Sequence, residues 1–215
     1  MSADRQISAL LKQIATQDVA VVTSQFFHAS RAATLAHVAE YYGFEYAEAC
    51  REGHNMQTLS VYLTRDPSPA AREREAATIA AHPRAGNGGT APGLQPGTLK
   101  PTAEAEEAVA RLTDLITFDV RTQMAGARRM GVAWAGVAVM VVTLLIVGMY
   151  VGAIAGGAAL AAFLAGAVKF SDMRRERIGR RLEEAGFVPV VDEAGRRRFV
   201  RPGRQLPGHA NPFAS

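Results

Sequence analysis

Residues 131–168 read GVAWAGVAVMVVTLLIVGMYVGAIAGGAALAAFLAGAV, which is 38 consecutive positions without an acidic, basic or histidine side chain. Basic residues flank this apolar run on both sides, with Arg128 and Arg129 before it and Lys169 and several arginines after it. Uncharged stretches of about 18 residues or more are typical of membrane-spanning helices. The run therefore predicts an integral membrane protein whose first partner is the lipid bilayer.

The length of the run favours two membrane spans over one. A single helix over the whole run would be roughly 57 Å long, whereas the hydrocarbon core of a bilayer is about 30 Å thick. We predict a transmembrane hairpin over 131–170, with spans near 131–151 and 155–170. One tilted span with an Ala/Gly-rich extension packed on protein is the alternative. The residues expected to form the turn, or to pack helix against helix if the helix continues, are Gly148, Gly152, Gly156 and Gly157.

The flanking charges predict the orientation of this hairpin. Lys and Arg favour the cytoplasmic side of a membrane, and both flanks of the run are basic. No apolar signal-peptide core precedes the run. We therefore expect a protein of the cytoplasmic (inner) membrane with both termini in the cytoplasm. Ion pathways usually need ionisable groups inside the membrane, so a transporter is disfavoured. The small residues Gly148, Gly152 and Gly156, spaced by four, keep a pore or channel subunit as an alternative.

The part that precedes the run predicts a small cytoplasmic α+β domain over 1–82. Residues 5–42 follow helical spacing, with a break near Thr16–Asp18 or Thr23–Ser24 left open, and 44–49 and 59–63 alternate as two strands of a β-hairpin. Ser68 is a helix N-cap followed by Pro69 at the first helical position. The predicted order is helix, helix, strand, strand, helix. A Gly/Pro-rich linker without a core of its own follows over 83–101.

Residues 102–130 predict an amphipathic juxtamembrane helix. Val109, Leu112, Ile116 and Val120 fall on one face of it. That face has four alternative uses: binding a protein partner on the 102–127 helix, pairing in a homo-oligomer, lying along the bilayer, or packing on the N-terminal domain of the same chain.

The C-terminal tail concentrates the positive charge. Residues 169–215 carry 11 Lys/Arg and 6 Asp/Glu, a net charge of +5, whereas residues 1–130 have a net charge of −1. We predict a basic helix and β-hairpin over 171–204 and a disordered tail over 205–215. Its arginines suit anionic lipid headgroups or the phosphates of nucleic acid. The candidate contacts are Arg174, Arg175, Arg177, Arg180, Arg181, Arg196, Arg197, Arg198, Arg201 and Arg204.

The sequence carries no recognisable catalytic pattern. The five histidines are not spaced as metal ligands, and no nucleotide-binding or nucleophile motif is present. The one cysteine, Cys50, excludes an intramolecular disulfide, and its acidic neighbours Glu45 and Glu48 raise a thiol pKa rather than lower it. We expect no enzyme activity, no metal and no cofactor.

The predicted fold class is a mostly α membrane protein with a small N-terminal α+β domain, a linker, an amphipathic helix, a two-helix transmembrane hairpin and a C-terminal helix plus β-hairpin. The predicted function is non-enzymatic recruitment or assembly at the membrane. A membrane-tethered, non-specific nucleic-acid binder in DNA transfer or in phage or plasmid biology is the alternative from another class, and the pore subunit is a third.

Overall fold

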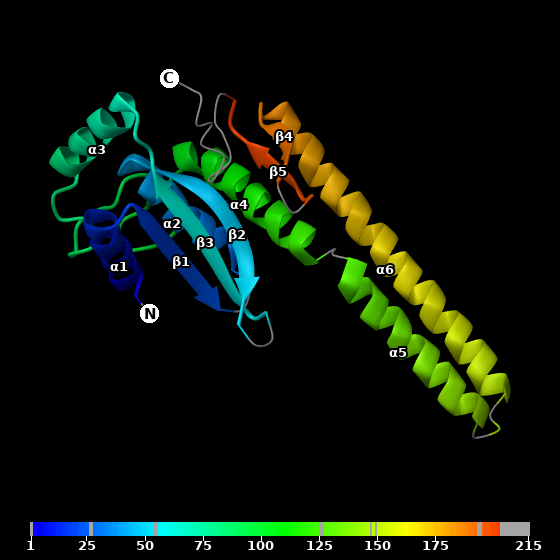
Figure 1. Ribbon diagram of the computed structural model, residues 1–215. Coiled ribbons are helices and arrows are strands. Elements are labelled where there is room, and N and C mark those ends of the chain that lie inside the picture. The colour runs from blue at the N-terminus through cyan, green and yellow to red at the C-terminus, as the bar shows by residue number, and fades with distance from the viewer. Residues whose placement is uncertain are drawn as a thin grey trace.

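A three-stranded antiparallel sheet organises the N-terminal half of the chain, and a long helical hairpin extends away from it (Figure 1). The computed structural model describes residues 2–25, 28–53, 56–124, 127–146, 148, 150–192 and 195–202. The elements are α1 (Ala3–Thr16), β1 (Val19–Gln25), α2 (Ala29–Tyr41), β2 (Phe44–Glu52), β3 (Thr58–Arg65), α3 (Pro69–Ala81), α4 (Ala103–Met124), α5 (Ala127–Ile146), α6 (Tyr150–Glu184), β4 (Val188–Val191) and β5 (Arg197–Val200).

The sheet has the strand order β1-β3-β2 and buries one of its faces. In its register Val22 lies opposite Val61, and Val61 lies opposite Ala49. These side chains point to the same face because residues paired across a sheet share a face. They form a common core with α2, whose residues 32–39 are all buried, and with α4.

The strand β1 corrects the prediction that 5–42 are helical on both sides of a break; α1 does end at one of the two expected break points, Thr16–Asp18, but the segment after it is a strand. Helix α1 ends at Thr16, and 19–25 pair with β3 instead. The segment contains Val19, Val21, Val22 and Thr23, whose β-branched side chains favour strands. The observed order is therefore helix, strand, helix, strand, strand, helix. Apolar spacing alone could not separate the two states, because a short apolar run fits both periods.

The Gly/Pro-rich segment 83–101, predicted as a linker, folds back over α2. Ala91 and Leu94 are buried in the common core, and the Gln95 N–H donates to the Lys100 carbonyl at 2.9 Å. Gly93 has a φ of +70°, and a Cβ there would lie 3.2 Å from Nε2 of His37. Glycine thus allows both the turn and the close approach to α2.

Helix α4 packs its apolar face on the N-terminal domain of the same chain. Leu112, Ile116 and Val120 on this face are almost fully buried, and the helix lies against α2 and β2. Of the four uses open to this face, intramolecular packing is the one that the structure shows.

The predicted transmembrane hairpin is wrong. Within the described ranges, no helix is both long enough and apolar enough to cross a membrane. The run is interrupted around Gly148, where φ is +83°, so α5 retains only the 16 uncharged positions 131–146, fewer than the roughly 20 needed to span a bilayer. Helix α6 continues from the apolar run into its arginine-rich half without a break and there packs on α4.

This finding also overturns the predictions built on the transmembrane hairpin. An integral membrane protein of recruitment type, a membrane-tethered nucleic-acid binder and a pore or channel subunit all required membrane-spanning helices, and no described helix qualifies. The inner-membrane location with both termini in the cytoplasm loses its support for the same reason.

Candidate interaction surface

The helical hairpin of α5 and α6 is closely packed where its two helices face each other. Val137 and Val141 of α5 and Leu164 of α6 are half-buried there, and Gly157 is buried. A Cβ added to Gly157 would lie only 2.7 Å from Cγ2 of Val141. The absent side chain therefore lets the two helices approach closely, as small residues do at other helix contacts.

The outer side of α5 carries large apolar side chains that are exposed. Val139, Val142 and Ile146 are spaced by three and four residues, so they form one stripe along the helix. Val139 is 67% exposed and Ile146 is 80% exposed. We call these three residues the α5 stripe. By helical geometry they lie on the side of α5 opposite Val137 and Val141, which face α6.

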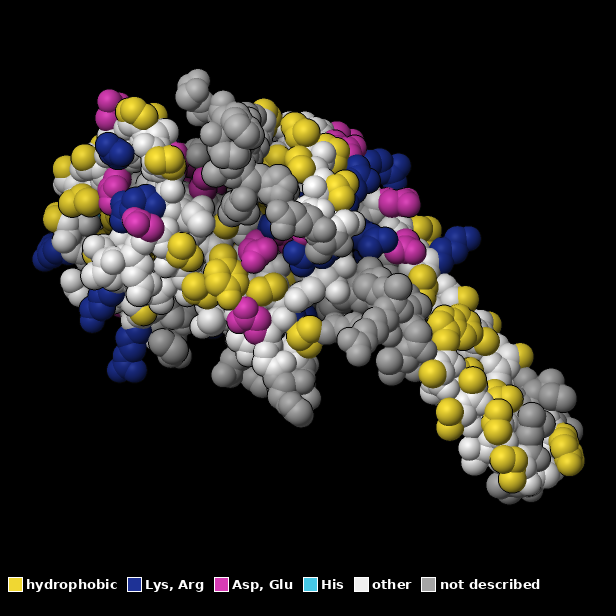
Figure 2. Space-filling model, viewed as in Figure 1, with side chains coloured by type: hydrophobic (Ala, Val, Ile, Leu, Met, Phe, Trp, Pro, Cys, Tyr) yellow, Lys and Arg dark blue, Asp and Glu magenta, His cyan; other side chains and the backbone are white. Residues whose placement is uncertain are grey.

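The outer side of α6 carries a second stripe of the same kind. Phe163, Phe170 and Met173 are all exposed, with Phe163 at 70%. They lie about half a helical turn away from Gly157 and Leu164, the residues that face α5. We call these three residues the α6 stripe. The hairpin therefore has an apolar edge on each of its two sides, and Figure 2 shows apolar and uncharged side chains over its outer part, with charged ones gathered nearer the sheet.

The hairpin is held firmly at its root by α4 and the β4–β5 hairpin. The rings of Phe118 and Phe199 meet edge to face with centroids 4.8 Å apart. A Cβ on Gly179 of α6 would lie 3.5 Å from the Phe199 ring, and Leu182 is buried among these residues. The root is therefore part of the same hydrophobic core as the sheet, and the apolar hairpin extends from a fixed base.

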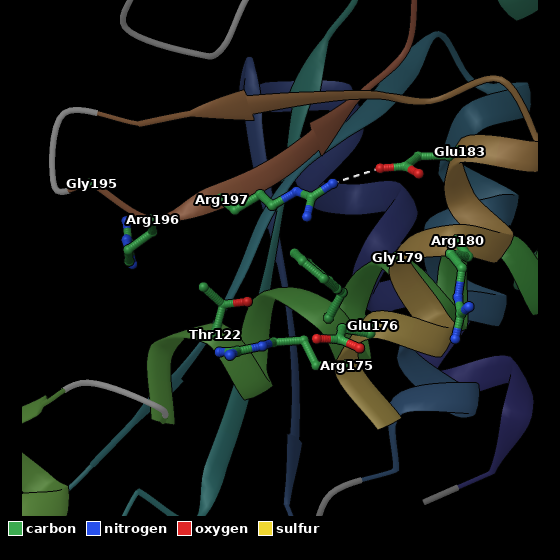
Figure 3. A pocket seen from close by; sticks show the side chains of 10 residues that line it. Thr122, Arg175, Glu176, Gly179, Arg180, Glu183, Gly195, Arg196 and Arg197 are labelled. Atoms are coloured by element: carbon green, nitrogen blue, oxygen red, sulfur yellow. Dashed lines mark hydrogen bonds and ion pairs between the residues drawn. The ribbon is translucent and has the colours of Figure 1, made fainter. Parts of the chain in front are cut away.

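Several of the arginines proposed as lipid or nucleic-acid contacts line a cleft at this root. The cleft has a volume of about 740 Å³ and lies between α4, α6 and the β4–β5 hairpin. Figure 3 shows Arg197 directed at Glu183, with an Nη2–Oε1 distance of 2.6 Å, and shows Arg175 and Arg180 leaving α6 in different directions. Arg175 pairs with Asp172 at 2.8 Å, and Arg196 pairs with Asp192 at 2.7 Å.

The arginines of β5 and just beyond it also turn toward carboxylates of the same chain. Arg198 donates to Asp119 at 3.1 Å, to Glu48 at 3.2 Å and to the Ala47 carbonyl at 2.6 Å. Arg201 pairs with Glu40. The β4–β5 hairpin therefore uses its positive charge to dock on the N-terminal domain, rather than presenting a free row of guanidinium groups.

The remaining predicted site residues lie along α6 or outside the described ranges. Arg174 stacks on Phe170, with 5.4 Å from its guanidinium carbon to the ring centroid. Arg177, Arg180 and Arg181 lie on α6 and form no ion pair with a carboxylate in the part of the chain that the structure describes. Gly152, Gly156 and Gly157 lie within α6, whereas Gly148 lies between the two helices; Arg204 and 205–215 are outside the described residues.

A buried polar network connects β2, α4 and β5. The Tyr46 hydroxyl donates to Asp119 at 2.7 Å, and the same carboxylate oxygen accepts from Arg198. Burial raises the pKa of Asp119, an effect that Arg198 and Tyr46 oppose. Burial also raises the pKa of Tyr46 well above its usual value, and the Asp119 charge adds to this shift. These groups hold the tail in place and offer no open site for a substrate.

The opposite face of the sheet carries a second polar cluster around Glu52. Its carboxylate accepts from Tyr62 and Ser60 at 2.7 Å each and from the Cys50 thiol at 3.3 Å. The Tyr62 hydrogen bond is the main cause that lowers the pKa of Glu52. Burial, followed by the bond to Glu52, raises the pKa of Cys50 to about 12. A thiol in this state is a poor nucleophile at neutral pH.

Neither cluster suits a metal ion. Across the described ranges, no three His, Cys, Asp or Glu side chains are arranged to hold one. No protein-family model, curated protein or solved structure matches this chain.

Sequence reasoning missed the two apolar stripes, although their signal is present in the run. The α5 stripe repeats at intervals of three and four, and Phe163 and Phe170 are seven apart. Such spacing marks one side of a helix that contacts another helix. Around Val139, Val142, Ile146 and Phe163 it was hidden because most neighbouring residues are also apolar, whereas Phe170 and Met173 lie just beyond the run among charged residues.

Proposed function

We propose that this protein is a non-enzymatic assembly protein whose copies associate through the α5 and α6 stripes. The carrying observation is that large apolar side chains are exposed on both sides of one hairpin whose outer part, 131–168, carries no charge. A helix that is apolar all round is stable in water only when it is covered. In this hairpin each helix is covered on one side alone.

A second copy of the chain is the occupant that these edges fit best. The four stripe residues Val139, Val142, Ile146 and Phe163 lie within the 38 uncharged positions of the run. A partner must cover them without bringing charges against them, and the outer part of an identical hairpin does so. Each stripe has the three-and-four or seven-residue spacing with which helices interdigitate. The globular part lies at one end of the hairpin (Figure 1) and leaves both edges accessible.

The two edges lie on opposite sides, and this decides the kind of assembly. Contact between unlike edges of successive copies is heterologous, and heterologous contacts close into rings when the rotation allows it. Covering six partly exposed side chains at one contact contributes roughly 6–9 kcal/mol, whereas association costs about 4–15 kcal/mol. One contact is therefore marginal, and an assembly in which most copies make two contacts, either a closed ring or an open filament, is favoured.

The first experiment is a mass measurement by light scattering on the full chain in detergent-free buffer. We expect three or more copies for the natural protein. Val142→Lys disables the α5 stripe and Phe163→Lys disables the α6 stripe, and each is expected to give monomers. Ile79→Lys is the matched control, because Ile79 is 53% exposed on α3 of the globular part; it should leave the mass unchanged.

Mixing the two variants tests the heterologous contact. The intact α6 stripe of the Val142→Lys chain can meet the intact α5 stripe of the Phe163→Lys chain. Because this single contact is marginal, the mixture should give a dimer at high protein concentration, at which each variant alone stays monomeric. Dimers of each variant by itself would show like-with-like contacts and contradict the heterologous contact. A monomeric natural protein would contradict self-assembly, and so would monomers that co-float with phosphatidylglycerol vesicles, because a bilayer would then be the occupant.

A further inference from the structure

The open edge of β1 carries backbone groups that the sheet does not use. The Arg65 N–H donates to the Asp18 carbonyl at 2.9 Å, and Val19 lies opposite Thr64. This bond makes Asp18 and Arg65 a hydrogen-bonded pair. Because hydrogen-bonded and non-hydrogen-bonded pairs alternate in an antiparallel ladder, Val19–Thr64 and every second pair after it exchange no hydrogen bonds. The N–H and C=O groups of Val19, Val21 and Thr23 therefore point away from β3.

The Gln13 side chain confirms this direction and occupies one of these groups. Its Oε1 accepts the Val21 N–H at 2.9 Å, from α1 across the strand edge. A side-chain amide is here in the place that a neighbouring strand's carbonyl would take. The Thr23 N–H, two residues along, faces the same edge.

A groove of about 530 Å³ runs beside this edge, between α1 and α2. Leu10 of α1, Val22 of β1 and Leu35 of α2 are among its apolar lining residues, and Figure 1 shows α1 lying beside β1. Its volume lies in the range of about 300–1,000 Å³ that is usual for ligand sites. A strand added to β1 would direct every second side chain toward it.

The charge at the groove identifies the kind of ligand. Arg31 lines it at the start of α2, is exposed, and forms no ion pair in the part of the chain that the structure describes. Among the described residues that line the groove there is no Asp or Glu. A carboxylate on the ligand would therefore find a cation without a competing anion, and guanidinium groups bind carboxylates strongly.

We propose that an extended acidic peptide of a partner protein binds along β1 as a fourth strand of the sheet. Its backbone pairs with Val21 and Thr23, an apolar side chain enters the groove, and a carboxylate meets Arg31. Gln13 releases the Val21 N–H to a peptide carbonyl when the strand arrives. This is the mode in which strand addition provides affinity through the backbone and pockets provide specificity.

Fluorescence anisotropy of the full chain with a fluorescein-labelled Glu-Val-Glu-Val-Glu-Val-Glu peptide tests the proposal, and the Lys-Val counterpart is the control. We expect the acidic peptide to bind at least tenfold more tightly. Arg31→Gln should weaken it about tenfold, while Arg72→Gln on α3 should not. Equal binding of the two peptides, or an Arg31→Gln variant that binds like the natural protein, would overturn the proposal.

Thr23 provides a test that a general charge effect would not pass. Thr23→Pro removes the outward N–H without removing a bond to β3, whereas Thr23→Val retains that N–H. We expect the first to abolish binding and the second to preserve it, with equal melting temperatures as the control for folding. Unchanged binding by a folded Thr23→Pro variant would exclude strand addition. The Val142→Lys chain should bind the peptide normally, so this result is independent of self-assembly.

Discussion

Arg198 and Asp119 are 79 residues apart in the sequence, yet Nη2 of the arginine lies 3.1 Å from Oδ2 of the aspartate. Their side chains are only 11% and 8% exposed. Through this pair the C-terminal hairpin is joined to α4, and thereby to the sheet. A tail whose composition suggested a separate nucleic-acid or lipid contact is thus an integral part of the globular fold.

Removal of this pair should reveal its structural role. Breaking a buried ion pair by removing one partner costs about 3–5 kcal/mol, because the other charge stays buried alone. We expect a loss of this size in the free energy of unfolding for Arg198→Met, measured by urea titration. Arg197→Met is the control, since its pair with Glu183 is about half exposed and should contribute no more than about 1 kcal/mol. Equal losses in the two variants would contradict the stabilising role of the buried Arg198–Asp119 pair.

Two glycines of α6 should respond in opposite ways to the same substitution. Gly166→Ala meets no atom within 4 Å and should stabilise the helix by roughly 0.5–1 kcal/mol. Gly157→Ala would place its Cβ 2.7 Å from Val141, whose χ1 is stiff in a helix, and overpacking typically costs about 1–3 kcal/mol. Thermal unfolding followed by circular dichroism measures both. Stabilisation by Gly157→Ala would show that the helices are not in close contact there.

The Cys50 thiol should react slowly with Ellman's reagent. Its pKa is raised to about 12 from the ordinary 9.0, which lowers the thiolate fraction at pH 8 by about a factor of 1,000. Glu52→Gln removes a neighbouring charge and should accelerate the reaction by about tenfold, since burial, the largest cause of the shift, remains. The unfolded protein gives the reference rate. A native rate close to that reference would contradict the raised pKa.

Stability should fall at alkaline pH, in part because of Tyr46. Burial holds the folded-state pKa of this phenol well above 10.0, so above about pH 10 the unfolded chain releases a proton that the folded chain retains. The contribution is complete below that pH and is lost as the pH rises. We expect the free energy of unfolding to fall between pH 9 and pH 11, and to fall less steeply in Tyr46→Phe. Parallel curves for the two proteins would show that Tyr46 does not titrate differently on folding.

Local signals in the sequence were sufficient for several elements. Ser68 caps α3 as expected, accepting from the Ala71 N–H at 3.3 Å with Pro69 at the start of the helix. Strands β4 and β5 pair around a turn in which Gly195 has a φ of +72°. These features depend on residues close in the chain, so short-range chemistry determines them. Strand β1 was missed because its state depends on β3, some forty positions away.

By itself, the sequence determined that 131–168 would be apolar, helical and without internal charge, because these are properties of the residues present. Only the tertiary structure decided what surrounds them. The first helix ends near Gly148, α6 continues into the core, where its Leu182 is buried, and many large apolar side chains of the run, including those of the two stripes, are exposed. It also decided that Arg198 meets Asp119. The physical reason is that burial and ion pairing depend on which segments, far apart in the chain, come into contact in the fold. Composition and local spacing do not determine those contacts.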